Sequence, residues 1–595
     1  QQQVKTGGYG AEYGRSLGGV INIVTKRGGN DFNFGGAVYT SPAALRSNTK
    51  DVKTVDPARE GEYTVYGSEN EYSTMSYNAW ASGAIIEDTL FVYGMIEGQN
   101  NQYDDYNKQE SDVYKDSDPQ YMLKLDWQIN DDHLLEFTHI QNEQTRNYTT
   151  YSNTDDALYT GKHGDEQSTY GLINGGAINI VKYTGYITDD LTVSLLWGNS
   201  ENLISVTTPS TIDPAAAECP RVFDSRDGGI TQIGCWNSAQ TTIPDPAVGP
   251  DRDIRDSLRL GLEYVLEDHS IKVGYDTELY TSEAQGWTYT GGTYWRYFTV
   301  GANGLVNSVD THTLQPGDTY VRQWDRFGAS ADFEVENTAF YIEDNWQATD
   351  DVLVYLGLRN ETFTNRNGDG DVFIEADNLI APRLGVSWDV NGDSTSKAFA
   401  NWGRYYIPVA SNSNIRASGV EYFDIDYFYY DSIDPTTGAP VGLGEQIGPT
   451  RVNGSDKAPD SRTISDVNIN PMYQDELILG YQQELTENFS LGIRYINREV
   501  KDGMDDFCAH QGFVDWAEDE GYDNFDYHTM AGCMFINPGK DLTFAIDVNN
   551  DGNLETHSIS NDYFKLPKYK REYQAVELFW ERSMTDGFYF QGSYT

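Results

Sequence analysis

A string of oxygen-bearing side chains near residue 550 has the spacing of a calcium-binding loop. Such loops place oxygen ligands at alternate positions and a glycine at the sixth, where the chain turns sharply. The positions are filled by Asp547, Asn549, Asp551, Gly552, Asn553 and Glu555. Position twelve is Ser558, so the bidentate glutamate of an EF-hand is missing. The pattern predicts weak calcium binding, with an ordinary turn rich in Asp and Asn as the alternative; residues 365–371 form a similar but shorter string.

The four cysteines form two local pairs, Cys219 with Cys235 and Cys508 with Cys533. Each pair falls inside one long irregular segment, which is typical of disulfides that staple loops in an oxidising compartment. A structural metal site is the alternative, but the spacings lack a C-x-x-C signature. We therefore predict two disulfides.

Residue patterns typical of catalytic sites do not occur in the sequence. The eight histidines are scattered and offer no metal-ligand pair at helical or hairpin spacing. A nucleophile elbow, a zinc motif and a phosphate loop are also absent. We expect no enzyme and no cofactor apart from the calcium considered above.

The chain is strongly acidic, with a formal net charge of −51 over 595 residues. Binding to a nucleic-acid backbone requires a basic surface, so nucleic acid is excluded as a partner. The acidity fits solvated loops or a saline habitat; attraction of a cationic ligand or of divalent ions is the more specific alternative.

Alternation of apolar and polar residues dominates the chain and predicts β-strands. In residues 121–130 the side chains of Tyr121, Leu123, Leu125, Trp127 and Ile129 share one face, opposite polar residues. The pattern recurs at 258–264, 271–279, 352–358, 477–481, 489–495 and 576–580. A run of about 18 apolar residues that could form a spanning helix is absent.

Short and long connections alternate between these strands. The short ones are acidic turns that predict hairpins, at 87–89, 130–133, 189–190, 266–269, 349–351, 391–393, 486–488 and 585–587. The long ones cover roughly 41–75, 104–118, 149–170, 204–253, 285–330, 408–472 and 501–572. Outer-membrane barrels show this asymmetry, whereas β-propellers and β-helices, the soluble alternatives, do not.

The opening segment Tyr9-Gly-Ala-Glu-Tyr-Gly-Arg-Ser-Leu-Gly-Gly-Val-Ile-Asn-Ile-Val-Thr-Lys-Arg-Gly-Gly-Asn30 resembles the end of the plug domain of TonB-dependent outer-membrane receptors. Residues 84–94 are similar to the first periplasmic hairpin of the Oar-like branch of that family, and residues 381–393 with 397–406 to its Pro-Arg-Leu-Gly and Gly-Arg-Tyr strands. At position 84 an alanine replaces the usual proline.

The resemblance implies an all-β fold, a transmembrane antiparallel β-barrel with the C-terminal end of a plug domain. The end of the plug domain would cover residues 1–31, and the barrel would cover residues 32–595. About 17 of the roughly 22 strands of the intact barrel would be present. We therefore expect a fragment, incomplete at the C-terminus of the barrel, because a sheet with two open edges would leave unpaired backbone groups in lipid.

The implied function is energy-coupled uptake across the outer membrane of a Gram-negative bacterium. The implied partners are outer-membrane lipid and the TonB inner-membrane energising complex, which acts through a plug segment that this sequence does not include. The substrate stays open between a peptide or protein, a glycan and a metal chelate. A passive channel or a surface adhesin on the same barrel is the alternative function.

Within the plug end, the resemblance points to a hinge or lock between plug and barrel. The residues concerned are Glu12, Arg15, Gly18, Gly19 and Asn22. Arg15 and Glu12 are expected to pair with lumen-facing charges, for which Glu263, Glu278 and Glu577 are candidates. Val20, Ile21, Ile23 and Val24 are expected to form a buried plug strand, and simple packing is the alternative to a role in motion.

Two aromatic runs, 294–298 and 422–430, have two interpretations. Near strand ends they would form interfacial girdles. In loops they would be ligand-contact surfaces.

Overall fold

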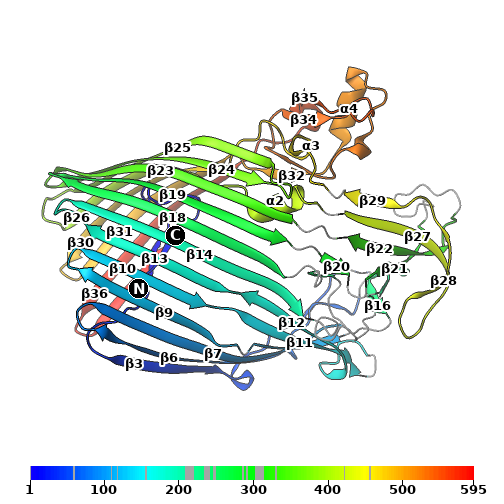
Figure 1. The fold of residues 1–595 in the computed structure, drawn as a ribbon, viewed down its shortest axis with the longest axis horizontal. Helices are drawn as coiled ribbons and strands as arrows, with labels where there is room; N and C mark the ends of the chain where they lie inside the picture. The colour runs from blue at the N-terminus through cyan, green and yellow to red at the C-terminus, as the bar shows by residue number, and fades with distance from the viewer. Residues whose placement is uncertain are drawn as a thin grey trace.

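The computed structural model describes residues 2–595 apart from 56, 58–59, 109, 117, 155–156, 208–219, 221, 234–241, 245–249, 285–286, 290–291, 302–313, 328–330, 421 and 455–456. One large antiparallel barrel sheet dominates it (Figure 1). The predicted all-β barrel is thereby confirmed. Among these residues, none of the helices is both long enough and apolar enough to span a membrane.

Within the described residues, the barrel sheet contains twenty strands, which form seventeen positions along the wall because three positions hold two strands each. In wall order the strands are β3 (Asn33–Ser41), β6 (Glu71–Ile86), β7 (Leu90–Tyr106), β8 (Glu110–Asp116) with β9 (Gln120–Asn130), β10 (His133–Gln141) with β11 (Gln144–Asn153), β12 (His163–Gly175) with β13 (Ala177–Tyr186), β14 (Leu191–Thr207), β18 (Asp251–Leu266), β19 (His269–Ala284), β23 (Ala331–Thr349), β24 (Val352–Arg366), β25 (Val372–Asp389), β26 (Ser396–Tyr406), β30 (Tyr473–Thr486), β31 (Phe489–Lys501), β36 (Arg571–Thr585) and β37 (Phe588–Tyr594).

At each of the three positions that hold two strands, one long strand is interrupted at a single place. Strand β7 pairs first with β9 and then, further along, with β8, and Pro119 separates these two. Proline has no N–H to donate to the ladder, so the strand is interrupted there. Gly176 separates β12 from β13 in the same way, where a Cβ would come within 2.4 Å of the Glu201 carbonyl oxygen.

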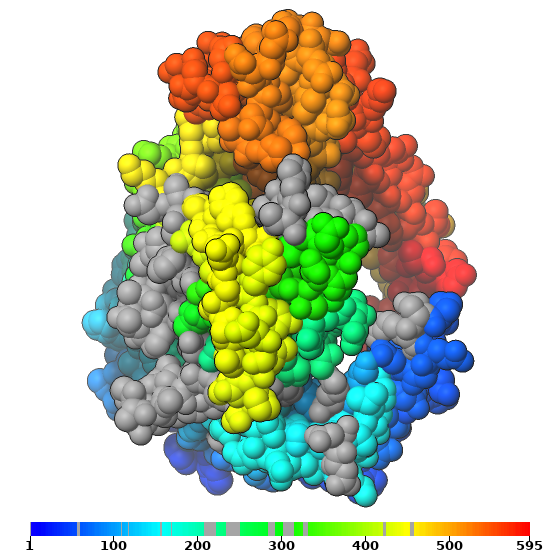
Figure 2. All heavy atoms as spheres, turned by 90° about the vertical axis from the view of Figure 1, so that its right-hand side faces the viewer, coloured from blue at the N-terminus to red at the C-terminus, as the bar shows by residue number. Residues whose placement is uncertain are grey.

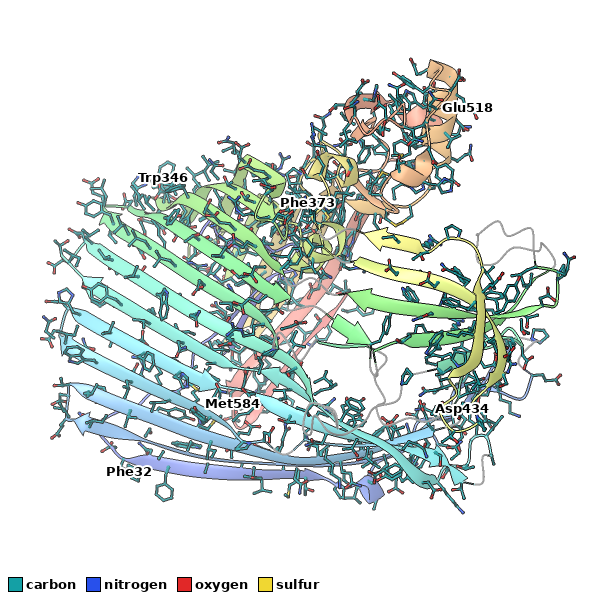
Figure 3. All side chains as sticks on the ribbon, turned by 45° about the vertical axis from the view of Figure 1, so that its right-hand side comes forward. Phe32, Trp346, Phe373, Asp434, Glu518 and Met584 are labelled. Carbon is teal, nitrogen blue, oxygen red and sulfur yellow. A yellow bond between two sulfur atoms is a disulfide. The ribbon has the colours of Figure 1, made fainter. Side chains whose placement is uncertain are left out.

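Alternation sorts the side chains of each wall strand into two faces. In β9, Leu123 and Trp127 are 38% and 45% exposed on the outer face, whereas Lys124 and Asp126 are 5% and 2% exposed on the inner face. The outer face is apolar and suits lipid, while the inner face is polar and charged, as in transmembrane barrels. Figure 3 shows Phe32 at the start of β3 pointing away from the wall.

All eight predicted acidic turns connect neighbouring wall strands, so the hairpin predictions are confirmed. They gather at the left end of Figure 1, and the long connections lie at the right end. Asp88, Glu267 and Asp586 have φ of 60°, 51° and 55° in these turns. Tight hairpins need such left-handed residues, and Asp tolerates them better than most residues do.

The long connections are more ordered than the sequence indicated. Three of them build a second sheet of seven strands: β15 (Val222–Asp224), β16 (Thr231–Ile233), β21 (Tyr294–Thr299), β22 (Thr319–Phe327), β27 (Tyr422–Ile433), β28 (Pro440–Gln446) and β29 (Arg451–Gly454). This outer sheet lies across the end of the barrel that faces the viewer in Figure 2, where β27 and β28 are yellow.

The two aromatic runs lie in β21 and β27 of the outer sheet, so the interpretation as interfacial girdles is wrong. Tyr297 and Tyr427 are 0% and 1% exposed and belong to the cores of this sheet. Pairing through β22 brings the two strands into one sheet, which no local pattern revealed.

The longest insertion, between β31 and β36, folds into a small unit of its own, orange in Figure 1. It contains β32 (Asp505–Phe507), α4 (Gln511–Glu520), η4 (Tyr527–Thr529), β33 (Met534–Ile536), β34 (Leu542–Ile546), β35 (Glu555–Ile559) and α5 (Asn561–Phe564). Phe513, Trp516, Phe544 and Ile546 pack into its apolar core. Gly521 ends α4 with φ of 82°, a left-handed conformation that favours glycine.

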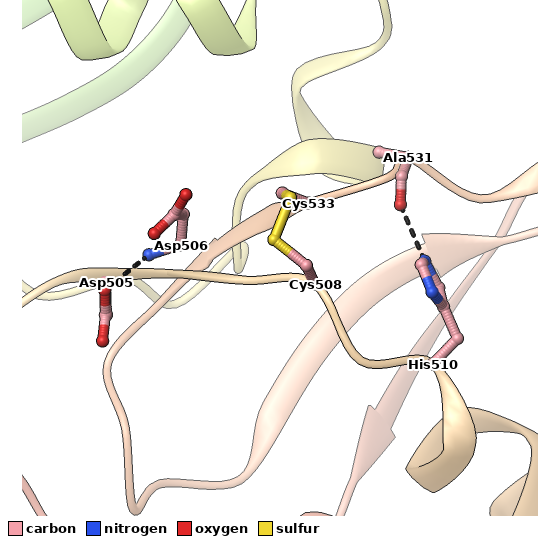
Figure 4. Close-up of a disulfide and its surroundings, with 6 residues drawn as sticks. All are labelled: Asp505, Asp506, Cys508, His510, Ala531 and Cys533. Carbon is pink, nitrogen blue, oxygen red and sulfur yellow. Dashed lines mark hydrogen bonds between the residues drawn. A yellow bond between two sulfur atoms is a disulfide. The ribbon is translucent and has the colours of Figure 1, made fainter. Parts of the chain in front are cut away.

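Cys508 and Cys533 form a disulfide in this unit, as predicted (Figure 4). Next to it, Nε2 of His510 lies 2.8 Å from the Ala531 carbonyl oxygen. The other predicted pair, Cys219 with Cys235, lies outside the described residues.

The remaining short elements lie in the first 31 residues and in the long connections. They are β1 (Gln2–Lys5), β2 (Val20–Ile23), η1 (Ala43–Leu45), β4 (Val52–Lys53), β5 (Tyr63–Val65), β17 (Thr242–Pro244), β20 (Trp287–Tyr289), α2 (Ser411–Ala417) and α3 (Ser461–Ile464).

β2 pairs with β1, but Ile21 and Ile23 are 62% and 69% exposed. The expectation that 20–24 form a buried strand is therefore wrong for the structure as it stands.

Replacing both cysteines of the small unit, Cys508→Ser with Cys533→Ser, should destabilise that unit alone. A disulfide across a sequence separation of 25 residues is worth about 3 kcal/mol in the chain-entropy model. We expect limited proteolysis to cut the variant within residues 502–570 and to leave the barrel intact. Equal resistance of the variant and the parent would contradict this.

Candidate functional site

Residues 6–17 lie against the inner wall of the barrel and form the candidate site. Gly8 N–H donates to Glu476 of β30 at 2.8 Å, and Ala11 N–H donates to the Tyr355 hydroxyl of β24 at 2.6 Å. Glu12 N–H donates to Glu343 of β23 at 3.1 Å, and Gln474 donates to the Leu17 carbonyl at 3.2 Å. The wall therefore satisfies backbone groups along the whole of residues 6–17. We call these residues the plug-end segment.

Arg15 forms the main charged contact of the plug-end segment with β19. One guanidinium nitrogen contacts Asp276, and the other lies 2.9 Å from Glu278. Both carboxylates face the lumen because they are two residues apart on one strand. The side chain of Arg15 is only 12% exposed, so this is a buried ion pair. Of the three predicted partners, Glu278 is present, whereas Glu263 accepts from Ser270 and Glu577 pairs with Arg494.

Asp276 also binds a second arginine, Arg359 of β24. Nη2 of Arg359 lies 3.0 Å from Asp276, and Nε lies 2.8 Å from Glu361. Arg359 and Glu361 are both 0% exposed. Nη1 of Arg359 donates to the Ala11 carbonyl at 3.3 Å. Asp276 thus connects the plug-end segment to two wall strands, and no sequence pattern singled it out.

Glu12 makes a parallel contact with the wall. It pairs with Lys272 of β19, and Arg259 of β18 lies 4.0 Å away. Glu12 and Arg15 are therefore both held by charges on β19. The prediction that these two residues meet lumen charges agrees with the geometry; their role as a lock stays a prediction.

Arg383 of β25 holds the segment through backbone carbonyls and aromatic rings. Its Nη1 donates to the carbonyls of Tyr9, at 3.2 Å, and of Gly10. Its guanidinium also lies 5.3 Å and 4.5 Å from the ring centroids of Tyr9 and Tyr405. Cation–π contacts of this kind stabilise a desolvated arginine. Arg383 stands in the Pro-Arg-Leu-Gly motif, which was the one sequence signal that could have identified it.

Glycines let the segment approach the wall closely. A Cβ on Gly14 would lie 2.3 Å from Glu361 Oε1 and 2.4 Å from Arg359 Nε, and one on Gly10 would lie 2.8 Å from Glu343 Oε2. Among the predicted hinge glycines, Gly19 has φ of 146° and packs against the Lys5 backbone, whereas a Cβ on Gly18 would meet open space. Asn22 is exposed in β2, opposite Gln3.

A second charged cluster holds the end of this region to β9 and β10. Arg27 lies 2.7 Å from Glu136, and Lys124 lies 3.1 Å from the same carboxylate. Glu136 also lies 3.3 Å from Lys182 of β13. Arg27, ten residues beyond the plug-end segment, therefore contacts a second part of the wall through charges.

The predicted calcium loop lies in the small unit. Burial raises the pKa of Asp547, but the backbone N–H groups of Gly552 and Asp551 outweigh it, so the pKa lies below its usual value. Glu555 begins β35. Among the described residues, one group of metal-ligating side chains comes together, Asp506 with the two disulfide-bonded cysteines, and it does not include this loop. Calcium binding stays a prediction.

Comparison with known proteins finds two similarities in sequence. Residues 47–378 match the outer membrane beta barrel domain family. The TonB-dependent transporter Oar of Myxococcus xanthus is 24% identical over 610 residues, covering 85% of this chain and 55% of that protein. The chain thus spans about half the length of this curated relative.

One solved structure shows the same fold at low sequence identity. The outer-membrane transporter YddB of Escherichia coli has a TM-score of 0.52 at 12% identity, covering 98% of this chain and 61% of that one. The siderophore receptor PirA of Acinetobacter baumannii has a TM-score of 0.48 at 13% identity, covering 98% and 65%.

Arg15→Gln should loosen the plug-end segment. The change leaves Glu278 and Asp276 with fewer cations, and breaking a buried ion pair costs about 3 kcal/mol. We expect hydrogen exchange of residues 7–17 to become at least about tenfold faster. Arg494→Gln is the control, since it breaks a wall pair with Glu577 that does not contact the segment. Equal exchange in both variants would refute the assignment.

Gly14→Ala should displace the segment, whereas Gly18→Ala should not. The added methyl group at position 14 meets Glu361 and Arg359, which are buried and held by ion pairs, while position 18 is open. Crosslinking between cysteines introduced at Ser16 and Tyr280 would report the displacement. A normal crosslinking yield in Gly14→Ala would count against the close approach.

Proposed function

This chain belongs to the outer membrane beta barrel domain family and is located in the outer membrane of a Gram-negative bacterium, and on that premise we propose that it acts as a TonB-dependent receptor for energy-coupled uptake. The curated relative is named as a TonB-dependent transporter, which supports this class of function. The contacts of residues 6–17 with the inner wall carry the proposal.

Those contacts favour a plugged barrel over an open pore. The segment that resembles the end of a plug is fixed to β19, β23, β24, β25 and β30 by buried ion pairs and hydrogen bonds. A passive channel has no need of buried arginines that bind backbone carbonyls of a lumen segment. Each such group is costly to bury unless it is paired, so the arrangement indicates a defined plug position.

We assign to Glu12 and Arg15 the role of a lock between plug and wall. Both side chains meet charges of β19, and Asp276 connects Arg15 to Arg359. Force on the plug would have to break these pairs before the plug could move. Gly19, where the chain passes close to Lys5, is the proposed hinge.

Binding to the energising complex tests the proposal. The full-length gene product, purified from outer membranes, should bind the periplasmic domain of TonB in calorimetry, and it should show no steady conductance in planar bilayers because the plug fills the lumen. A large steady conductance without TonB binding would establish the passive channel instead. TonB binding is measured without any substrate, so its outcome does not depend on the identity of the substrate.

A further inference from the structure

Two arginines lie directly opposite each other in the outer sheet. Arg296 of β21 and Arg322 of β22 are register partners, so their side chains lie side by side on one face of the sheet. Figure 1 shows these strands among the long connections, beyond the ends of the wall strands. Like charges that lie opposite each other destabilise a sheet, so this placement calls for a compensating partner. We call the two residues the arginine pair.

Aromatic rings surround the arginine pair. The guanidinium of Arg322 lies 4.6 Å from the ring centroid of Trp324 and 5.2 Å from that of Phe298. The ring of Tyr294 lies 5.9 Å from the same guanidinium. The guanidinium of Arg296 lies 5.0 Å from the Phe298 ring, so one ring contacts both cations. Cation–π contacts offset only part of the cost of burying two charges.

The described residues give the arginine pair few acceptors. Arg322 is 8% exposed, and its Nε is buried without a hydrogen-bond partner. Nε of Arg296 donates to the Ser225 hydroxyl at 2.9 Å. Within the described part of the chain, no carboxylate forms an ion pair with either guanidinium. Acidic residues outnumber basic ones by 92 to 41 in this protein, so a shortage of carboxylates does not explain this.

Arg226, on the other face of the same sheet, shows the usual arrangement. It pairs with Asp224 of β15 at 2.6 Å, and its guanidinium lies 5.7 Å from the ring of Tyr297. Tyr297 follows Arg296 directly in β21, so the two side chains point to opposite faces. An arginine in this sheet can therefore have both a ring and a carboxylate, whereas the arginine pair has only rings and a hydroxyl.

The electrostatics of the arginine pair favour a bound anion. Burial lowers the pKa of Arg322 below its usual value, and the positive charge of Arg296 lowers it further. An anion between the two guanidinium groups would remove their repulsion and supply the missing acceptor. The negative charge of the whole protein opposes this only weakly, because interactions beyond about 8 Å are largely screened at physiological salt.

We propose that the arginine pair binds an oxyanion, a phosphate or carboxylate group carried by a small ligand. A guanidinium presents parallel N–H donors that match two oxygens of such a group. Because Arg322 is 8% exposed, the site admits one compact anionic group rather than the extended charge of a polymer. The inference rests on the proposed function and deepens it, because it gives the receptor an anionic substrate class.

Calorimetry and hydrogen exchange on the full-length protein in detergent test the site with inorganic phosphate and citrate, and with spermidine as a cationic probe. We expect phosphate or citrate to bind and to slow the hydrogen exchange of residues 294–299 and 319–324. The tighter of the two distinguishes a phosphate ligand from a carboxylate ligand. Arg322→Gln and Arg296→Gln should each weaken the affinity at least about tenfold, because each removes charged donors. Arg322→Lys keeps the charge but loses the fork of donors, so it should weaken the affinity less.

Arg226→Gln is the matched control and should bind anions as the parent does, because this arginine already has a carboxylate partner. The proposal is overturned if neither phosphate nor citrate slows exchange in the two strands, if Arg322→Gln and Arg226→Gln bind anions equally, or if only spermidine binds there. The exchange measurement uses the unaltered protein, so it decides the question even where a variant fails to fold. Anion binding needs no TonB, so its failure is distinct from a failure of the proposed function.

Discussion

A strand in lipid has no water to satisfy its backbone, so every N–H and C=O must be paired within the sheet. The continuous pairing of neighbouring wall strands answers this constraint. Because side chains alternate along a strand, one half of each strand faces lipid and the other half faces inward. The inward half is free to be polar. Asp276, Glu278, Glu343, Arg359 and Arg383 are there for that reason, and the plug-end segment could not be held by charges without them.

The buried charged side chains hold one another in position. Arg359 is completely buried, yet Asp276, Glu361 and the Ala11 carbonyl together satisfy it. Removing one member would leave the others unpaired in a poorly solvated space, which is why such networks fix one geometry rather than adding much stability. The segment is therefore positioned closely by the wall.

Sequence patterns predicted the barrel and its turns well, because alternation and turn residues are local signals. They named Glu278 as one of three candidate partners of Arg15 and Glu12 but missed Asp276 and Arg359, since inward charges look alike in sequence and their pairing depends on which strands are neighbours. The outer sheet was missed for the same reason: β22 joins β21 to β27 across almost a hundred residues of chain. The exposure of β2 was also unexpected, because an apolar run indicates a strand but not what covers it.

The place of the small unit in the wall bears on how its sequence can vary. Val500 at the end of β31 is the register partner of Arg571 at the start of β36, so the unit leaves and re-enters the wall at adjacent points. Its core and its disulfide are its own. Exchange of the whole insertion would keep the register of β31 and β36, but it would also replace the hydrogen bonds that Asp466 and Val467 donate to the carbonyls of Phe535 and Thr543. Variation in the insertion could thus change the surface at this end of the barrel while the register of the two wall strands that carry it stays the same.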